Sequence, residues 1–573
     1  MDKATAIYKK LSALPSLAAL SFVFLVASAN YHLDAATTWQ NEMPLPKSPI
    51  VAETKPLSPA NDNNAINVLS MRDADLYRAA FAAQEKGDWI SADNNLKQIK
   101  DKKLFGHVLA DRYMRRPTTL AEAKEWMDSY AALPEAEALY DNARRLHGFA
   151  VAHIKRPLQM ATWSGSRGYG ASSGFKATVR TANGNEAASF FYKGNIVQAR
   201  ATAHKASSKG SSLGLWIEGL SAWKQKDYVG SERSFASLAQ TPGLSSWDQS
   251  AASFWAYRAA NRSGDKKEAS YWLAESAKYP HSFYGAIATS MTGKRLNQSW
   301  KMPELTHQYV ADIAATAAGW QALALVQVGR SDLAADELRL MPLHEHNMEM
   351  AALALAEKAH MAALSLQLAG VVTNDNGKLF DAAMYPVPAW QPTGGFKVDR
   401  ALMYALMRHE SQFDPDAVSS QGACGLMQIM PDTARRIDNN SGNGHHCSDR
   451  LFDPAVNMAL GQKYVRVLSD EPAIGNNLLL LLAAYNGGPA NLNHWLDNAD
   501  RKDPLFFIES MPIRETRDYV QQVLLHYWMY RARLAEPETS VAQLGRGEWP
   551  RYALHDETAA QSGRAKALEI ASR

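Results

Sequence analysis

The hydrophobic pattern of the chain is helical from about Ala74 to Asp381. Alanine is abundant there, runs of β-branched residues are few, and short turn signals return at intervals. The turn signals are Lys86-Gly87-Asp88, Lys193-Gly194-Asn195, Gln225-Lys226-Asp227, Ser263-Gly264-Asp265 and Gly329-Arg330-Ser331-Asp332. From the second signal onward the spacing is close to one or two units in the mid-thirties, which is the period of helix–turn–helix solenoids. Because one helical hairpin cannot bury its apolar face alone, we expect the hairpins to stack into a curved superhelix.

A shorter helical pattern leads into Glu410. Apolar residues recur there at steps of four, and the carboxylate continues the row formed by Met403 and Met407. Pro415 follows shortly, so we expect the helix to end near Phe413. Glu410 then lies at the negative end of a helix dipole and in partly apolar surroundings. Both effects disfavour the charged form and raise its pKa, as a general acid requires.

The N-terminus has the pattern of an export signal. Lys3, Lys9 and Lys10 form a basic start, an apolar run extends from Leu17 to Ala27, and Ala27-Ser28-Ala29 gives a small-x-small cleavage site. The run is short for a transmembrane helix. We expect cleavage after Ala29 and export, with an uncleaved membrane anchor as the alternative.

Composition and charge restrict the class of protein. At 573 residues the chain is too long for a single hydrophobic core. Its apolar content of 46% and charged content of 21% are those of a folded protein, and its net charge of +3 gives no field for nucleic-acid binding. The 15 Trp and 22 Tyr suit either packing between helices or stacking on sugar rings.

Both cysteines, Cys424 and Cys447, follow Glu410. Export into an oxidising compartment favours a disulfide between them, which would add about 3 kcal/mol to the free energy of unfolding. Two unpaired thiols are the alternative. The cluster His445-His446-Cys447 lacks a second group of ligands at the usual spacing, so we predict no metal site.

Three motifs stand in the C-terminal part of the chain. The longest reads Glu410-Ser411-x-Phe413-x-Pro415-x-Ala417, then Ser419, then Gly422-Ala423-x-Gly425-Leu426-Met427-Gln428-Ile429-Met430-Pro431. The second is Ala483-Ala484-Tyr485-Asn486-Gly487-Gly488-Pro489, and the third runs from Met511 to Val520. The three motifs resemble those of the soluble lytic transglycosylases, lysozyme-like enzymes that cleave bacterial peptidoglycan. This family usually has Ala at the position of Gly487 and favours an aromatic residue at that of Ile513.

The resemblance implies an all-α fold in which an N-terminal α-superhelix precedes a mainly helical, lysozyme-like catalytic domain. The step Phe283-Tyr284-Gly285 resembles the helical arm of the same family. A scaffold that confines glycan strands and a protein-interaction array are both consistent with this region. We predict a signal peptide over 1–29, a linker or weakly ordered arm over 30–70, the superhelix over 71–384, a Pro-rich bridge over 385–394, the catalytic domain over 395–535 and a polar, mobile tail or loose cap over 536–573.

The resemblance also implies roles for single residues. Glu410 acts as acid and then base, and Tyr485 has a hydroxyl that orients it. The implied substrate-binding residues are Ser419, Gln428, Met430, Tyr485, Asn486 and Glu515. A salt bridge with Arg517 is the alternative role for Glu515. Ser411 is expected to brace the chain locally.

The implied reaction is cleavage of the bond between N-acetylmuramic acid and N-acetylglucosamine, with formation of a 1,6-anhydro ring and without a cofactor. Standard glycosidases need two carboxylates, but Asp414, Asp416 and Asp432 have the patterns of turn or helix-start residues. The alternatives are a hydrolytic muramidase like goose-type lysozyme and a non-catalytic, glycan-binding adaptor. The expected location is the periplasm, and association with the outer face of the membrane is compatible with it. The expected partners are peptidoglycan strands and other envelope proteins. Oligomeric state, peptide-stem preference and cleavage at chain ends or mid-strand stay open.

Overall fold

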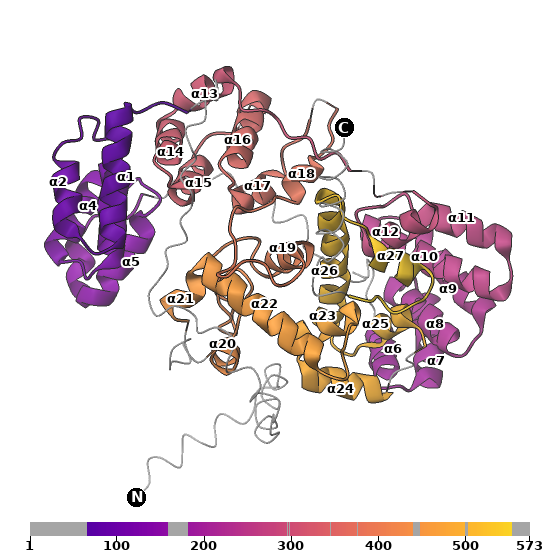
Figure 1. Cartoon of the computed structure of the whole chain (residues 1–573). Helices are drawn as coiled ribbons and strands as arrows, with labels where there is room; N and C mark the ends of the chain where they lie inside the picture. Colours follow the sequence, from indigo (N-terminus) through magenta and orange to yellow (C-terminus); the bar gives the residue numbers. More distant parts are fainter. Residues whose placement is uncertain are drawn as a thin grey trace, which may run out of the picture. The chain divides into compact units, whose positions relative to one another are not determined.

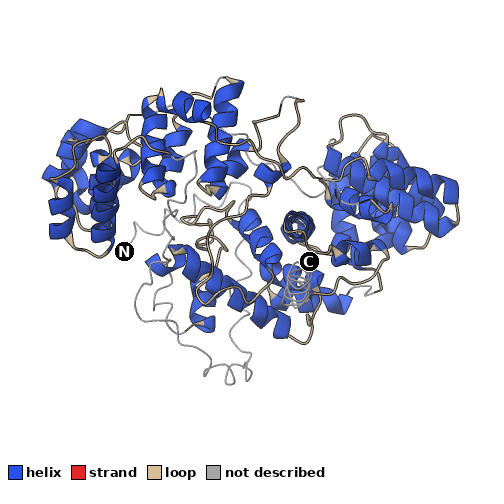
Figure 2. Cartoon of the chain, turned by 45° about the horizontal axis from the view of Figure 1, so that its top comes forward, coloured by secondary structure: helices blue, strands red, loops and turns tan. Residues whose placement is uncertain are grey.

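The computed structural model describes residues 66–158, 182–294, 296, 298–343, 345–374, 376–438, 447–498 and 502–552. Within these ranges the regular secondary structure is helical, and the only strand-like features are isolated β-bridges. Figure 2 shows helices throughout the described part. The predicted all-α fold is therefore confirmed. None of the described helices is both long and apolar enough to cross a membrane. The predicted signal peptide over 1–29 lies outside the described residues.

The first group of helices comprises α1 (Met71–Glu85), α2 (Trp89–Leu96), α3 (Phe105–Arg115), α4 (Leu120–Tyr130), α5 (Ala136–His147) and the short 3-10 helix η2 (Gly148–His153). Buried residues of α4, α5, η2 and the end of α3 form a second hydrophobic cluster, whereas others from α1 and α2 belong to the main hydrophobic core. Just before α1, the backbone amides of Val68 and Leu69 donate hydrogen bonds to the side chain of Gln327. The end of the predicted linker is thus attached to a helix much later in the chain.

Three helical hairpins follow, and consecutive hairpins pack against each other (Figure 1). Their helices are α6 (Ala182–Tyr192), α7 (Ile196–Ser207), α8 (Ser212–Lys224), α9 (Tyr228–Ala239), α10 (Ser246–Ser263) and α11 (Lys266–Ser276). Each hairpin turns through one left-handed residue, namely Gly194, Lys226 or Gly264. The side chains of Asp227 and Asp265 then cap the second helices of their hairpins by accepting hydrogen bonds from backbone amides of the first turn. The turn signals in the sequence therefore mark real hairpins.

The helices that complete the N-terminal region are α12 (Phe283–Met291), α13 (His307–Ala314), α14 (Ala317–Gln327), α15 (Ser331–Arg339), α16 (His346–Lys358), α17 (Ala362–Leu368) and α18 (Asp381–Met384). Gly329 adopts φ 84° in the turn between α14 and α15, which the sequence also predicts. After α18 the chain is non-helical up to α19, in agreement with the proline-rich segment. The hydrophobic core continues across this segment, so the proposed domain limits stay a prediction.

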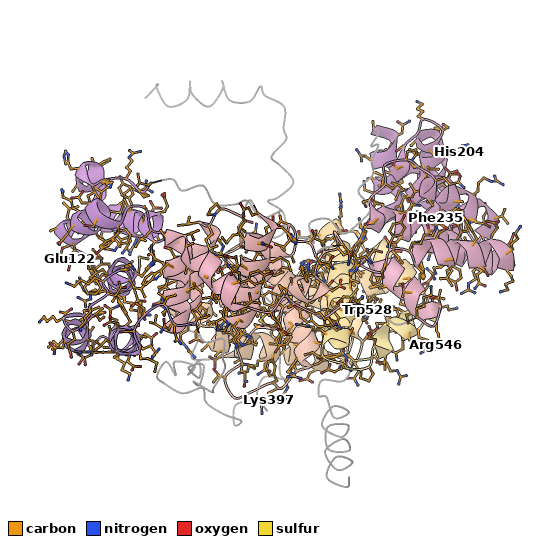
Figure 3. All side chains as sticks on the ribbon, turned by 90° about the horizontal axis from the view of Figure 1, so that it is seen from above. Glu122, His204, Phe235, Lys397, Trp528 and Arg546 are labelled. Carbon is orange, nitrogen blue, oxygen red and sulfur yellow. A yellow bond between two sulfur atoms is a disulfide. The ribbon has the colours of Figure 1, made fainter. Side chains whose placement is uncertain are left out.

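The C-terminal region is organised around α26. Its helices are α19 (Arg400–Glu410), α20 (Pro431–Ile437), α21 (Asp449–Phe452), α22 (Pro454–Asp470), α23 (Leu478–Gly487), α24 (Pro489–Asn498), α25 (Pro504–Ser510) and α26 (Arg514–Arg533). Helix α26 packs against α12, α19, α23 and α25, as Figure 1 shows for α19 and α23. Trp528 on α26, labelled in Figure 3, is among the largest fully buried side chains. Burial from several sides explains why α26 is apolar or aromatic over much of its surface.

The structure describes residues 536–552 of the segment that the sequence predicts to be a mobile tail or a loose cap. Helix α27 (Thr539–Gly545) packs on α12, and its Val541 and Leu544 are buried. After it, the carbonyl of Pro550 accepts a hydrogen bond from the backbone amide of Leu478. Val541 and Leu544 stand three positions apart and form a short apolar face, which the surrounding glycines and charges obscure in the sequence. Residues 553–573 lie outside the described ranges.

Candidate functional site

Glu410 is the last residue of α19, whose preceding two turns are buried. The helix ends here rather than near Phe413 because Gln412 and Phe413 adopt left-handed φ values of 54° and 67°. The hydroxyl of Ser411 donates to the carbonyl of Met407 or to that of Leu426, at 3.1 Å and 2.8 Å. Ser411 thus braces the chain locally, as the sequence predicts. The end of the helix is thus held against the loop that follows.

The carboxyl group of Glu410 is half-buried and makes one hydrogen bond to a side chain. The hydroxyl of Tyr519 donates to Oε1 at 2.7 Å. Burial raises the pKa of Glu410 to about 7; the bond from Tyr519 opposes this rise and the negative charge of Glu515 adds to it. A carboxyl with this pKa is present in both protonation states near neutral pH, so it can donate a proton and take one back.

The hydroxyl that contacts Glu410 differs from the expected one. Tyr485 uses its hydroxyl to donate to the carbonyl of Met427 at 3.0 Å. Its ring stacks on that of Tyr519, with centroids 6.4 Å apart and an interplanar angle of 11°. Tyr485 therefore contacts the orienting tyrosine and braces the loop at Met427. The sequence contained a usable signal for Tyr519, since it stands four residues after Glu515 and so shares its face of α26.

The loop between α19 and α20 is held by its own polar side chains. The Ser419 hydroxyl oxygen accepts a hydrogen bond from the backbone amide of Ala423 at 3.0 Å. The side-chain amide of Gln428 donates to the carbonyls of Ala417 and Gly425 at 3.0 Å and 2.9 Å. Gln428 itself adopts φ 47°. Both predicted substrate-binding residues thus have hydrogen bonds that shape the loop beside Glu410.

A disulfide joins Cys424 to Cys447, with Cα atoms 6.0 Å apart and a sequence separation of 23. Cys424 is fully buried and belongs to two isolated bridges, with Val418 and with Ile429. The covalent link therefore attaches the start of α21 to the centre of the loop. His445 and His446 lie outside the described residues, and in the described part no group of three or more His, Cys, Asp or Glu side chains could hold a metal ion.

The remaining predicted site residues lie around this loop. Met430 is 39% exposed at the start of α20. The side-chain oxygen of Asn486 accepts a hydrogen bond from the Thr516 hydroxyl at 2.7 Å, which joins the second motif to the third. Glu515 is exposed in the first turn of α26. Within the described ranges it has no ion pair with Arg517, whose guanidinium donates to the carbonyl of Met511.

The aspartates considered as a second acid have structural contacts of their own. Asp414 accepts a hydrogen bond from the backbone amide of Asp416, as in an Asx turn. Asp432 forms an ion pair with Arg435 one turn later in α20. The neighbouring carboxylate whose charge acts on Glu410 is Glu515.

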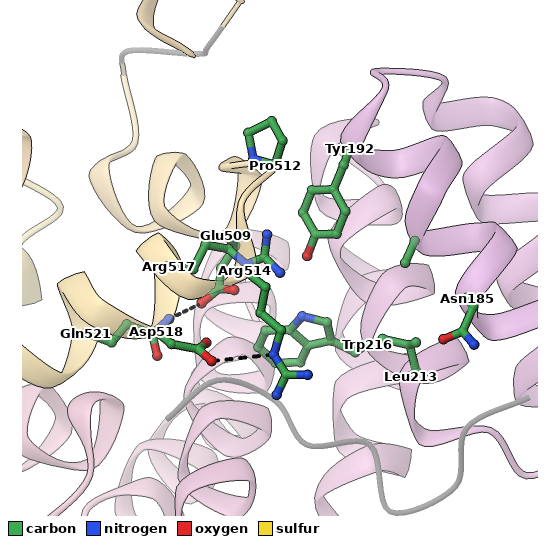
Figure 4. Close-up of a pocket in the computed structure, with 11 residues that line it drawn as sticks. Asn185, Tyr192, Leu213, Trp216, Glu509, Pro512, Arg514, Arg517, Asp518 and Gln521 are labelled. Atoms are coloured by element: carbon green, nitrogen blue, oxygen red, sulfur yellow. Dashed lines mark hydrogen bonds and ion pairs between the residues drawn. The ribbon is translucent and has the colours of Figure 1, made fainter. Parts of the chain in front are cut away.

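A cavity of about 220 Å³ lies on the other side of the third motif (Figure 4). Helices α6 and α8 contribute Tyr192 and Trp216, and α25 and α26 contribute Glu509 and Arg517. The Arg517 guanidinium lies over the Tyr192 ring, 4.3 Å from its centroid. The third motif thus has one face toward Glu410 and another toward the N-terminal helices.

Part of this site lies in a segment that is similar to known proteins. Residues 390–506 match the Transglycosylase SLT domain. Curated relatives include the soluble lytic murein transglycosylase of Escherichia coli K12, which is 37% identical over 161 residues, covering 28% of this chain and 24% of that protein. The membrane-bound lytic murein transglycosylase C of Haemophilus influenzae is 32% identical over 123 residues, covering 20% of this chain and 34% of that protein.

A solved structure, an inactive mutant of lytic transglycosylase Slt from Pseudomonas aeruginosa, aligns at 17% identity and a TM-score of 0.48, over 81% of this chain and 74% of that one. The chain matches about a quarter of the length of its soluble curated relatives, 24% for the one from Escherichia coli K12. The SLT match includes Glu410, both cysteines and the second motif, and it ends before Glu509 and Tyr519.

Proposed function

We propose that this protein is a peptidoglycan lytic transglycosylase. It cleaves the β-1,4 bond between N-acetylmuramic acid and N-acetylglucosamine and leaves a 1,6-anhydro end. The observation that carries the proposal is the carboxyl of Glu410, which lies in the region similar to SLT domains, has a pKa raised to about 7 and accepts a hydrogen bond from Tyr519.

In the first step, protonated Glu410 donates its proton to the glycosidic oxygen, and the bond to the anomeric carbon breaks. The positive charge that develops on the muramic acid ring is stabilised by the oxygen of the substrate's own acetamido group. The hydrogen bond from Tyr519 stabilises the carboxylate that this step leaves behind.

In the second step, the Glu410 carboxylate takes the proton from the 6-hydroxyl of the same sugar. The oxygen of this hydroxyl attacks the anomeric carbon and closes the anhydro ring, which regenerates the protonated acid. No water is consumed. The internal nucleophile gains a large effective molarity, on the order of 10⁵ M in well-oriented systems.

Substrate binding is assigned to the residues around the loop. Met430 and Glu515 are exposed and offer an apolar and a charged contact to the glycan. Ser419, Gln428 and Tyr485 hold the backbone of the loop, Asn486 holds Thr516, and their remaining polar atoms contact the sugars. The N-terminal helical region confines the glycan strand, and the enzyme works in the periplasm after export.

Mass spectrometry of the muropeptides released from purified sacculi tests the proposal. Products of a transglycosylase have anhydro ends, and products of hydrolysis carry one additional water and a reducing end. Anhydro products are the expected result. Reducing ends would identify a hydrolytic muramidase, and the absence of soluble products with intact binding would identify a glycan-binding adaptor; either result contradicts the proposal.

A further inference from the structure

The step Phe283-Tyr284-Gly285 at the start of α12 contacts the third motif. Tyr284 is 1% exposed, and its hydroxyl donates to Oε1 of Glu509 at 2.5 Å. Phe283 stacks on Trp528 of α26, with centroids 5.4 Å apart and an interplanar angle of 17°. Gly285 has no Cβ that would collide with the carbonyl of Tyr279, so the first turn of α12 can lie against that carbonyl. These consecutive residues join the helical region to α25 and α26.

Glu509 is the shared acceptor of this junction. It lies in the last turn of α25 and is 5% exposed. Its Oε1 also accepts a hydrogen bond from the side-chain amide of Gln521 on α26 at 2.8 Å. Figure 4 shows this bond at the edge of the cavity. One carboxyl oxygen therefore links three helices, α12, α25 and α26.

The start of α25 is attached to the helical region as well. Arg258 on α10 donates to both carboxylate oxygens of Asp503 at 2.8 Å and 2.7 Å. Asp503 also caps α25 by accepting from the backbone amide of Phe506. Because both ends of this short helix are held, Glu509 has a defined position relative to α10 and α12.

The contacts of Glu509 with Gln521 and of Phe283 with Trp528 hold α26 on the side opposite Glu410. Gln521 and Trp528 are seven residues apart, so they lie on one face of the helix and fix both its rotation and its shift along its axis. Tyr519 precedes Gln521 by two positions, a rotation of about 200°. The face held by Tyr284, Glu509 and Phe283 is thus opposite the face that presents the Tyr519 hydroxyl to Glu410.

We propose that Tyr284 and Glu509 are positioning residues for the reaction, which hold α26 so that Tyr519 stays in hydrogen-bonding contact with Glu410. This inference rests on the proposed function for its kinetic consequences. Both residues lie outside the segment similar to SLT domains, which covers 390–506. The helical region then contributes to the reaction itself, in addition to confining the substrate.

The variant Tyr284→Phe tests the proposal, because it removes the hydroxyl and retains the ring that stacks on Phe254. Small displacements of a catalytic contact are costly, so we expect kcat on purified peptidoglycan to fall about 10-fold with little change in KM. Tyr519 and Glu515 act on the pKa of Glu410, and Glu410 in turn raises the pKa of Tyr485. Since the bond from Tyr519 lowers the pKa of Glu410, its weakening moves the high-pH limb of activity to higher pH.

Two comparisons separate positioning from general stability. Tyr77→Phe removes an equally buried hydroxyl, one that donates to the carbonyl of Asp101 at 2.6 Å far from α26, and we expect it to lower stability without moving the pH profile. Glu509→Gln keeps an oxygen that accepts from Tyr284 and Gln521, whereas Glu509→Ala removes it. The glutamine variant is therefore expected to lose less of kcat than the alanine variant.

A readout without substrate distinguishes this inference from the proposed function. The carboxylic-acid C=O band of Glu410 is isolated in infrared spectra by subtracting the spectrum of Glu410→Gln, and it is titrated in the wild type and in Tyr284→Phe. A higher pKa of Glu410 in Tyr284→Phe supports the positioning role even if the enzyme turns out to be hydrolytic. An unchanged pKa, or kinetics identical to those of Tyr77→Phe, would overturn the proposal.

Discussion

At the scale of single residues, the chemistry depends on the balance of charges at Glu410. Burial and the charge of Glu515 favour the protonated carboxyl, and the Tyr519 hydroxyl favours the carboxylate. Neither form is strongly preferred near pH 7, which suits a group that must give and regain one proton in each cycle.

The first prediction concerns Glu410→Gln. Glutamine keeps the size and the hydrogen bond from Tyr519 but cannot transfer the proton, so release of muropeptides is expected to fall at least ~100-fold. The reaction begins with protonated Glu410, whose pKa is about 7. Wild-type activity should therefore decline as pH rises through 7, and the residual activity of the variant should not follow this limb. Near-normal turnover by Glu410→Gln would exclude the single-acid mechanism.

The second prediction compares two stacked tyrosines. Tyr519→Phe removes the donor to Glu410, so the pKa of Glu410 is expected to rise, the high-pH limb of activity to move upward and kcat to fall about 10-fold. Tyr485→Phe removes the bond to the Met427 carbonyl instead, and we expect a change in KM with the pH limb in place. Rate–pH profiles of both variants provide the measurement, and a shifted limb in Tyr485→Phe alone would assign the orienting role to Tyr485.

At the scale of elements, the loop after α19 depends on backbone conformations that few residues adopt. Gln412, Phe413, Gly422, Gly425 and Gln428 all have positive φ. They end α19 directly after the acid and fold the next segment back beside it. The disulfide and the side chains of Ser419 and Gln428 then hold the loop in this shape.

The third prediction uses two glycines of this loop. Gly425 has φ 73° and lies against the carbonyl of Leu451, so Gly425→Ala adds both backbone strain and a collision. We expect a loss of at least about 3 kcal/mol in the free energy of unfolding. Gly422 has φ 82° and no atom near its missing Cβ, so Gly422→Ala should cost only about 1 kcal/mol. Urea unfolding of both variants measures the difference, and equal losses would contradict the collision at Leu451.

At the scale of the whole molecule, residues far apart in sequence complete the site. Tyr284 and Glu509 are separated by 225 positions and Arg258 and Asp503 by 245, yet each pair is in direct contact. The helical region and the C-terminal region share one hydrophobic core. The two regions are distant along the chain, but each therefore contributes to the stability of the other.

The fourth prediction tests this connection through Arg258. Its side chain is 11% exposed, and its guanidinium pairs with Asp503 and lies 4.4 Å from the ring centroid of Trp255. Arg258→Ala leaves a largely buried carboxylate without this partner and should lower the free energy of unfolding by about 3 kcal/mol. Arg200→Ala breaks a more exposed pair with Asp227 and should cost less than about 1 kcal/mol. Similar losses for both in denaturant titrations would show that the Arg258 pair adds little.

The packing of residues 536–552 could not be predicted from local sequence patterns. Residues 536–552 contain glycines, a proline and mixed charges, which are typical of a mobile end. Their order comes from α12, on which α27 packs, and from the hydrogen bond between the backbone amide of Leu478 and the carbonyl of Pro550. A short apolar face predicts a stable helix only when the surface that buries it is known.

The sequence by itself determined the features that neighbouring residues encode. The helical hairpins, the positions of their turns, the helix that leads into Glu410 and the apolar row beneath this carboxyl all follow from local periodicity and local backbone preference. Only the tertiary structure decided that Tyr519, and not Tyr485, donates to Glu410, that Tyr284 reaches Glu509, and that the last described segment is a helix docked on α12. These are contacts across more than a hundred residues, and they depend on how helices pack, which no local pattern records.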